Sequence, residues 1–162
     1  MTKYATKYDR TANRESILSN ESFKLESTWT FVAATTGAIA QHTLFTVTGN
    51  VLVNVFGVCD TNLDSGGAAT ISIGTAGNVA NIISVTTATV IDDGDLWITN
   101  VPTVQTQAIS ESSGIGLPWV VNDGADITID ILTATITAGV IDFYCLWRPL
   151  SSDANVTVTT PA

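Results

Sequence analysis

Apolar and polar residues alternate with a period of two along much of the chain after residue 25. Residues 127–131 read Ile-Thr-Ile-Asp-Ile, and residues 141–147 place four apolar side chains on one side: Ile141, Phe143, Cys145 and Trp147. Successive side chains of a β-strand point to opposite faces, so each segment predicts a strand with one face in a core. Tyr144 and Leu146 make the second face of 141–147 apolar as well, which predicts that this face is also covered.

Further strands are predicted from runs rich in Thr, Val and Ile, because β-branched side chains favour the pleated surface of a sheet. These runs are residues 29–35, 43–48, 51–56, 69–73, 82–86, 96–99, 104–109 and 118–121. Clusters of Gly, Asn and Asp separate them, and these residues tolerate the positive φ of tight turns. About ten short strands with regular turns predict an all-β fold, an antiparallel β-sandwich of jelly-roll type.

The first 24 residues differ from the rest of the chain in charge. They hold five of the six basic residues and three acids, whereas the remainder holds Arg148 and twelve acids. This segregation predicts an extended N-terminal arm, residues 1–25, ahead of a sandwich domain, residues 26–162. A segment with so little apolar surface is expected to become ordered only on a partner. The expected partner-binding residues of the arm are Lys3, Lys7, Arg10, Arg14, Phe23, Lys24 and Leu25.

Composition narrows the classes of partner. Only 13% of the residues are charged and 45% are hydrophobic, against about 25% charged in an average domain. This shortage predicts that partners cover part of the surface; a monomer coated with Ser and Thr is the alternative. A pI near 4.1 argues against nucleic-acid binding by the body. The apolar runs are too short to span a membrane, and no signal peptide is expected at the polar start.

The residue types that carry chemistry are sparse. His42 is the single histidine, so neither a Ser–His–Asp triad nor a classical zinc site is expected. Residues 92–95, Asp-Asp-Gly-Asp, carry oxygens that suit calcium, but their spacing is not that of an EF-hand and favours a plain turn. Residues 74–78 lack the Lys and the helix of a phosphate-binding loop and also predict a turn. We therefore expect no enzyme activity, no metal and no cofactor.

The cysteines and tryptophans have structural interpretations with one alternative each. Cys59 and Cys145 lie in strand-like segments and are expected to be two buried thiols, with a bridge between neighbouring strands as the alternative. The tryptophans are expected in the core or in a subunit contact. A sugar-binding platform that uses Trp97 or Trp119 is the alternative for them.

Several turn and strand signatures carry a resemblance to a family. They are Phe-Thr-Val-Thr-Gly at 45–49, Ile-Gly-Thr-Ala-Gly-Asn at 73–78, Asp-Asp-Gly-Asp-Leu-Trp at 92–97, and the closing Ala-Gly at 138–139 with Phe-Tyr-Cys-Leu-Trp-Arg-Pro-Leu-Ser at 143–151. In this order they resemble small structural proteins of tailed bacteriophages. The likeness covers residues 29–156 and includes no catalytic residue.

The best understood of these phage proteins are head decoration, or cement, proteins, which are β-sandwiches, commonly trimers, bound outside the capsid lattice. The resemblance implies a virion component on the capsid exterior, made in the host cytoplasm, that binds the major capsid protein and forms a homotrimer. Such a protein would stabilise the lattice. The alternatives are a tail, neck or baseplate component, and a carbohydrate-binding module on the virion surface.

Overall fold

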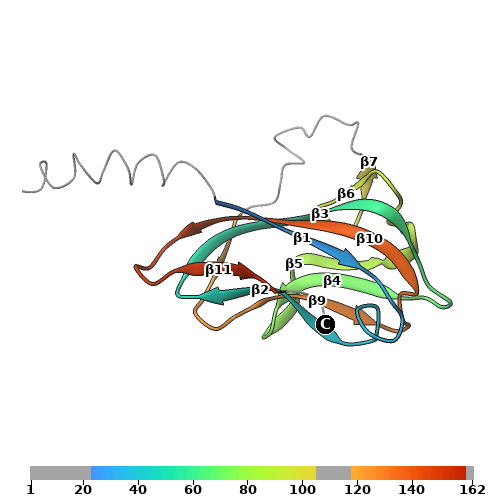
Figure 1. Ribbon diagram of the computed structural model, residues 1–162, viewed down its shortest axis with the longest axis horizontal. Helices are drawn as coiled ribbons and strands as arrows, with labels where there is room; N and C mark the ends of the chain where they lie inside the picture. The colour runs from blue at the N-terminus through green and yellow to red at the C-terminus, as the bar shows by residue number, and fades with distance from the viewer. Residues whose placement is uncertain (1–22, 105–117, 160–162) are drawn as a thin grey trace, which may run out of the picture.

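A computed structural model describes residues 23–104 and 118–159, and the described residues form two antiparallel sheets packed face to face (Figure 1). Sheet A contains β1 (Phe23–Thr30), β10 (Ala138–Pro149), β3 (Val51–Asp64), β6 (Asp95–Trp97) and β7 (Thr103–Val104) in that order, and β8 (Trp119–Val121) pairs with β3. Sheet B contains β11 (Asn155–Val158), β2 (Gln41–Thr48), β9 (Ile127–Leu132), β4 (Thr70–Thr75) and β5 (Asn78–Thr87). The predicted all-β sandwich is confirmed, and the jelly-roll type stays a prediction.

Most connections carry the chain from one sheet to the other. The two hairpins within a sheet join β4 to β5 and β6 to β7. A single 3₁₀ turn, Ala88–Val90, follows β5. Within the described part of the chain, no helix has the length and hydropathy of a membrane span.

The longest strands, β3 and β10, pair in the middle of sheet A and fix its register. Cys145 lies opposite Val55, and Tyr144 lies opposite Phe56. On the other side of β10, Tyr144 lies opposite Glu26 of β1. Burial alternates along β10, so that its odd-numbered residues 141–147 face the core and the even-numbered residues face outward.

The core lies between the sheets and differs in character on its two sides. Sheet B contributes mainly isoleucines: Ile71, Ile73, Ile83, Ile127, Ile129 and Ile131. Sheet A contributes aromatic rings, including an edge-on pair of Trp97 and Phe143 with centroids 6.2 Å apart. A Cβ atom at Gly57 would lie 2.8 Å from Ile141 and 3.3 Å from Phe143, so this glycine makes room for the rings.

The strand boundaries correct two predictions. A strand was expected over 29–35, but β1 ends at Thr30 because the Thr36 hydroxyl donates to the Thr30 carbonyl and accepts from Val32 N–H, which closes a turn. The domain boundary expected after residue 25 falls inside β1, which begins at Phe23. Of the strand expected over 104–109, residue 104 lies in β7 and the rest lies outside the described residues.

Candidate interaction surface

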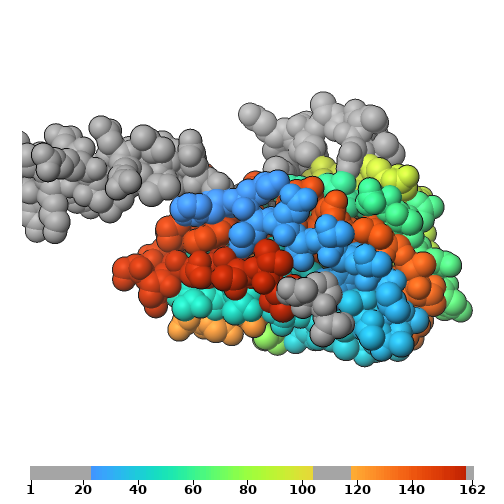
Figure 2. Space-filling model, viewed as in Figure 1, coloured from blue at the N-terminus to red at the C-terminus, as the bar shows by residue number. Residues whose placement is uncertain are grey.

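The structure places the predicted arm residues in two groups. Phe23, Lys24 and Leu25 are the first residues of β1, so they belong to the sandwich and not to a separate arm. Lys3, Lys7, Arg10 and Arg14 lie outside the described residues. In the space-filling view, β1 (blue) lies along the surface beside β10 and the C-terminal strand (red) (Figure 2).

Phe23 and Leu25 face the core because β1 alternates in the same way as β10. The Phe23 ring lies 4.8 Å from the Trp147 ring between centroids, and Leu25 packs against the buried cluster. The Trp147 indole N–H is buried and has no acceptor among the described residues. Phe23 itself is 39% exposed. These two predicted anchors therefore hold β1 onto its own sandwich.

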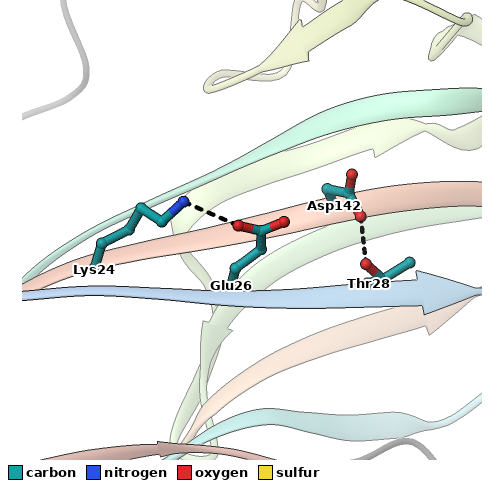
Figure 3. Close-up of polar contacts among 4 residues, drawn as sticks. All are labelled: Lys24, Glu26, Thr28 and Asp142. Atoms are coloured by element: carbon teal, nitrogen blue, oxygen red, sulfur yellow. Dashed lines mark hydrogen bonds and ion pairs between the residues drawn. The ribbon is translucent and has the colours of Figure 1, made fainter.

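Lys24 is engaged by its own strand and by β10. Its Nζ lies 2.9 Å from Glu26 Oε2 (Figure 3). The same Nζ lies 5.0 Å from the centroid of the Tyr144 ring. The hydrogen bond to Glu26, followed by the charge of Glu26, raises the pKa of Lys24. Both side chains are about half exposed, so the pair contributes little to stability. Lys24 is therefore a surface residue of sheet A.

The outward-facing side chains of sheet A form a mixed apolar and charged surface, which we call the sheet A face. Its apolar members come mainly from the two central strands, and the Phe56 and Tyr144 rings stack with centroids 5.3 Å apart. A hollow of about 120 Å³ lies beside Leu52 and Leu146. The face comprises Lys24, Glu26, Thr28, Leu52, Asn54, Phe56, Val58, Leu96, Val120, Asp142, Tyr144, Leu146 and Arg148.

The sheet A face also holds both basic residues of the described part of the chain, Lys24 and Arg148. Two acids, Glu26 and Asp142, balance them within the face, and Asp142 Oδ1 accepts a 2.6 Å hydrogen bond from the Thr28 hydroxyl (Figure 3). Asp60 follows Val58 at a β-bulge on the edge of the face. The other described acids lie in turns, in sheet B or at the ends of two strands of sheet A, outside the sheet A face: Asp64, Asp92, Asp93, Asp95, Asp123, Asp126, Asp130 and Asp153. The sheet A face is therefore close to neutral, whereas the rest of the described surface is anionic.

The outward side of sheet B is polar in its centre; we call the residues Gln41, Thr43, Ser72, Thr128 and Asp130 the sheet B face. Gln41 Nε2 donates to Thr128 Oγ1 at 3.2 Å, and the Ser72 hydroxyl donates to the Val79 carbonyl at 2.9 Å. Asp130 is 7% exposed, and its carboxylate accepts no hydrogen bond from the described residues. Hydroxyl and amide groups thus take the place that aromatic and aliphatic groups hold in sheet A.

The acidic sequence at 92–95 forms a turn, as predicted. Asp95 Oδ2 accepts a 3.0 Å hydrogen bond from Asp92 N–H, and Gly94, at φ 82°, donates its N–H to the Cys59 carbonyl. Asp93 N–H donates to the Asn62 side chain at 2.6 Å. Asp95 is 8% exposed and its carboxylate accepts from the backbone of the turn, so it stabilises the turn. Among the described residues, no group of three or more His, Cys, Asp or Glu side chains is placed to hold a metal ion.

His42 and the two cysteines also have structural environments. His42 Nε2 lies 3.2 Å from the Ala38 carbonyl, and its ring lies edge-on to Trp29. The thiols of Cys59 and Cys145 are buried and free, as predicted. Burial raises the pKa of Cys59 to about 11 and that of Cys145 to about 12, so the reactive thiolate is disfavoured at both positions.

The tryptophans fill the core to different extents. Trp29 and Trp97 are almost fully buried, and Trp97 Nε1 donates to the Thr86 hydroxyl across the two sheets at 3.0 Å. The alternative of a sugar platform on Trp97 is therefore wrong. Trp119, on β8, is 40% exposed and is still accessible to a ligand.

Comparisons with protein-family models, with curated proteins and with solved structures gave no match.

Proposed function

We propose that the protein is a structural component of a virion, a capsid decoration protein that binds the major capsid protein on the outside of the shell. The observation that carries the proposal is the unequal surface of the sandwich. One nearly neutral, partly apolar face, the sheet A face, lies on a body whose other described charges are all acidic. Such a surface suits a subunit of a larger assembly, which makes a fixed protein contact on one side and faces solvent elsewhere.

The basic residues of the first 22 positions are the second support for the proposal. They hold Lys3, Lys7, Arg10 and Arg14, and these cations would dock on acidic surfaces of neighbouring capsid subunits. The segment is continuous with β1, which pairs with β10 at all of its eight residues. A mechanical force on the segment is therefore distributed along the whole of β1. Each contact contributes little, but the lattice repeats it, so the shell resists internal pressure.

The anionic remainder of the surface suits the outside of a particle. Turns and sheet B carry acidic side chains without a described basic partner. Like charge keeps particles apart and repels free nucleic acid. This charge and the resemblance to decoration proteins support a position on the capsid exterior. The trimer that the resemblance implies stays a prediction, and it competes with the pair inferred below.

Two other functions remain as alternatives. A tail, neck or baseplate component would use the same sandwich, and the number of copies in a particle separates the two roles, since decoration needs many more copies than a ring. A glycan-binding role would use Trp119, which is 40% exposed. Quenching of tryptophan fluorescence by cell-wall sugars in wild type, absent in Trp119→Ala, would favour that role.

Binding to empty capsid shells tests the proposed decoration function. We expect the full chain to bind the shells, and the variant with Lys3, Lys7, Arg10 and Arg14 all changed to Gln to bind at least about tenfold more weakly, because several charge contacts are lost together. A variant with Thr2, Thr6, Thr11 and Asn13 all changed to Gln is the matched control and is expected to keep binding, because it leaves the four cations in place. Undiminished binding by the fourfold variant would contradict the role of the segment, and no binding by wild type would contradict decoration.

A further inference from the structure

We infer that the sheet A face pairs two copies of this chain about a two-fold axis, with the β10 strands of the two copies antiparallel. The inference goes beyond the proposed function, because it concerns the purified protein and holds whatever the particle contains. It stands on three properties of the described residues: the neutrality of the sheet A face, the order of its charges along β10 and β1, and its apolar centre.

The first property concerns where two copies can approach. The chain carries a formal net charge of −9, so two copies repel one another at most orientations. On the sheet A face Lys24 and Arg148 balance Glu26 and Asp142, so this repulsion is smallest when two such faces meet. The occupant best matched to a neutral, partly apolar face is another face of the same kind.

The second property is the order of the outward side chains along β10. It runs from an acid through two apolar residues to a base: Asp142, Tyr144, Leu146, Arg148. A two-fold axis perpendicular to the strand, between Tyr144 and Leu146, places the Asp142 of each copy opposite the Arg148 of the other. Sheets that pack face to face lie about 10 Å apart with their strands nearly aligned, a spacing that long side chains span.

The charges on the neighbouring strand β1 are complementary about the same two-fold axis. Lys24 lies beside Leu146 and Glu26 lies beside Tyr144 in the register of sheet A. The axis that exchanges Tyr144 and Leu146 therefore also places Lys24 of one copy opposite Glu26 of the other. Two independent charge pairs are complementary under one symmetry operation, which is the requirement of an isologous interface.

The third property is the apolar centre between the charges. Phe56 of β3 lies beside Tyr144 in the register of the sheet, and their rings stack 5.3 Å apart between centroids. The hollow beside Leu52 and Leu146 gives room for a side chain of the partner. Aromatic and aliphatic groups in the middle with charges around them match the anatomy of protein interfaces.

The cationic first 22 residues of the chain are a poorer match for this surface. The sheet A face already holds both described basic residues, so a segment that adds Lys3, Lys7, Arg10 and Arg14 gains no complementary charge there. The acidic turns and sheet B offer these cations a better contact. We therefore assign the sheet A face to a second copy and leave the basic segment for other surfaces.

Sedimentation velocity of the full-length protein tests the pair, with exchanged charges as the probe. Wild type is expected to reach a dimer as concentration rises. Asp142→Arg alone places like charges opposite one another, and so does Arg148→Asp alone, so each is expected to weaken dimerisation at least about tenfold. Equal amounts of the two variants, mixed, are expected to form a heterodimer, because both pairs are then complementary. The double variant with both exchanges is expected to dimerise like wild type.

A second pair of variants separates loss of the interface from loss of the fold. Leu146→Glu places a charge in the centre of the sheet A face and is expected to leave a folded monomer. Val85→Glu makes a similar change on β5 of sheet B, where the side chain is 47% exposed, and is expected to dimerise normally. Circular dichroism and thermal melting confirm that each variant folds. A wild-type monomer at all concentrations, a trimer, or single variants that do not complement each other on mixing would overturn the inference.

Discussion

The outward sides of the two sheets differ although their inward sides share one core. In the sheet A face, aromatic and aliphatic groups are partly exposed and charges of both signs surround them. In the sheet B face, Ser72, Thr128 and Asp130 are buried, and the hydroxyl groups of Ser72 and Thr128 bond to the backbone or to another side chain of the face. A contiguous apolar patch on one side of a sandwich favours a contact there, since hydroxyl groups can occupy the same positions.

The strands β9 and β10 illustrate the difference residue by residue. Both send their odd-numbered residues into the core, but burial alternates only along β10, whereas Thr128 and Asp130 of β9 are buried as well. The outward residues of β9 are Thr128 and Asp130, whereas those of β10 include Tyr144 and Leu146. Burial alone would therefore predict larger effects of mutation on the outward side of β9 than on that of β10, and the predictions below test where the sides differ.

The largest effect is expected from a substitution on the inward side of β10, compared with a substitution at the adjacent outward residue. Phe143→Ala removes a fully buried ring that contacts Trp97 and should lower the free energy of unfolding by about 3–5 kcal/mol. Tyr144→Ser, one residue along, should cost less than about 1 kcal/mol in the monomer and should instead weaken dimerisation. Urea unfolding at low protein concentration measures the first effect and sedimentation measures the second. A loss of stability as large for Tyr144→Ser would show that its side chain serves the fold.

Alkaline pH should destabilise the protein through sheet A, because Cys59 and Cys145 both lie on its inner side. Burial raises the pKa of Cys145 from 9.0 to about 12. The folded state then holds a proton that the unfolded state loses above pH 9, so stability falls as pH rises, by about 1.4 kcal/mol per pH unit until the folded pKa is reached. Cys145→Ala should show a shallower fall of the unfolding free energy between pH 9 and pH 11.

Ile129→Val, on the inner side of sheet B, is the control for this pH dependence. Its slope should equal that of wild type, because it removes no titrating group. A Cys145→Ala slope equal to wild type would place the alkaline sensitivity elsewhere.

A smaller effect is expected where the two sheets are joined at the end of the sandwich. Asp123, in the turn between β8 and β9, accepts a 2.8 Å hydrogen bond from Gly49 N–H after β2. Asp123→Ala leaves this donor without its carboxylate and should lower the free energy of unfolding by about 1–2 kcal/mol. Asp60→Ala, an exposed acid outside this turn, should change it by less than about 0.5 kcal/mol. Equal effects of the two changes in chemical denaturation would show that the bond does not stabilise the join.

The smallest effect is expected on the sheet B face. Asp130 carries a mostly buried carboxylate that accepts no hydrogen bond from the described residues. Asp130→Thr continues the row of hydroxyl groups and removes a carboxylate that no described donor satisfies, so it should raise the free energy of unfolding by about 0.5–1 kcal/mol. Dimerisation should not change. Destabilisation in thermal melting would mean that this carboxylate has a role in the fold.

Much of the sandwich could be predicted from the sequence, since alternation needs only neighbouring residues. Alternation identified the core side of β10 and the strand at 127–131. The Gly and Asp residues identified the turn at Asp92–Asp95. Alternation missed the start of β1 because Lys24 and Glu26 at outward positions and Ser27 at an inward one made this strand resemble a polar arm. A period-two pattern of Phe23, Leu25 and Trp29 was the available signal.

The candidate surface could be predicted only in part. The apolar second side of 141–147 indicated a covered face, and its residues Tyr144 and Leu146 lie in the sheet A face. The complementary charge pairs depend on the register between β1, β3 and β10, which joins residues more than a hundred positions apart. No local pattern carries that information.

Hydroxyl-radical footprinting of the full-length protein below and above its association concentration tests the contact on the sheet A face most directly. We expect modification of Phe56, Tyr144 and Leu146 to fall as the protein associates, while that of Val85 in sheet B stays constant. Equal modification of Phe56, Tyr144 and Leu146 at both concentrations, in a sample that has associated, would contradict the account, because the copies would then meet through another surface.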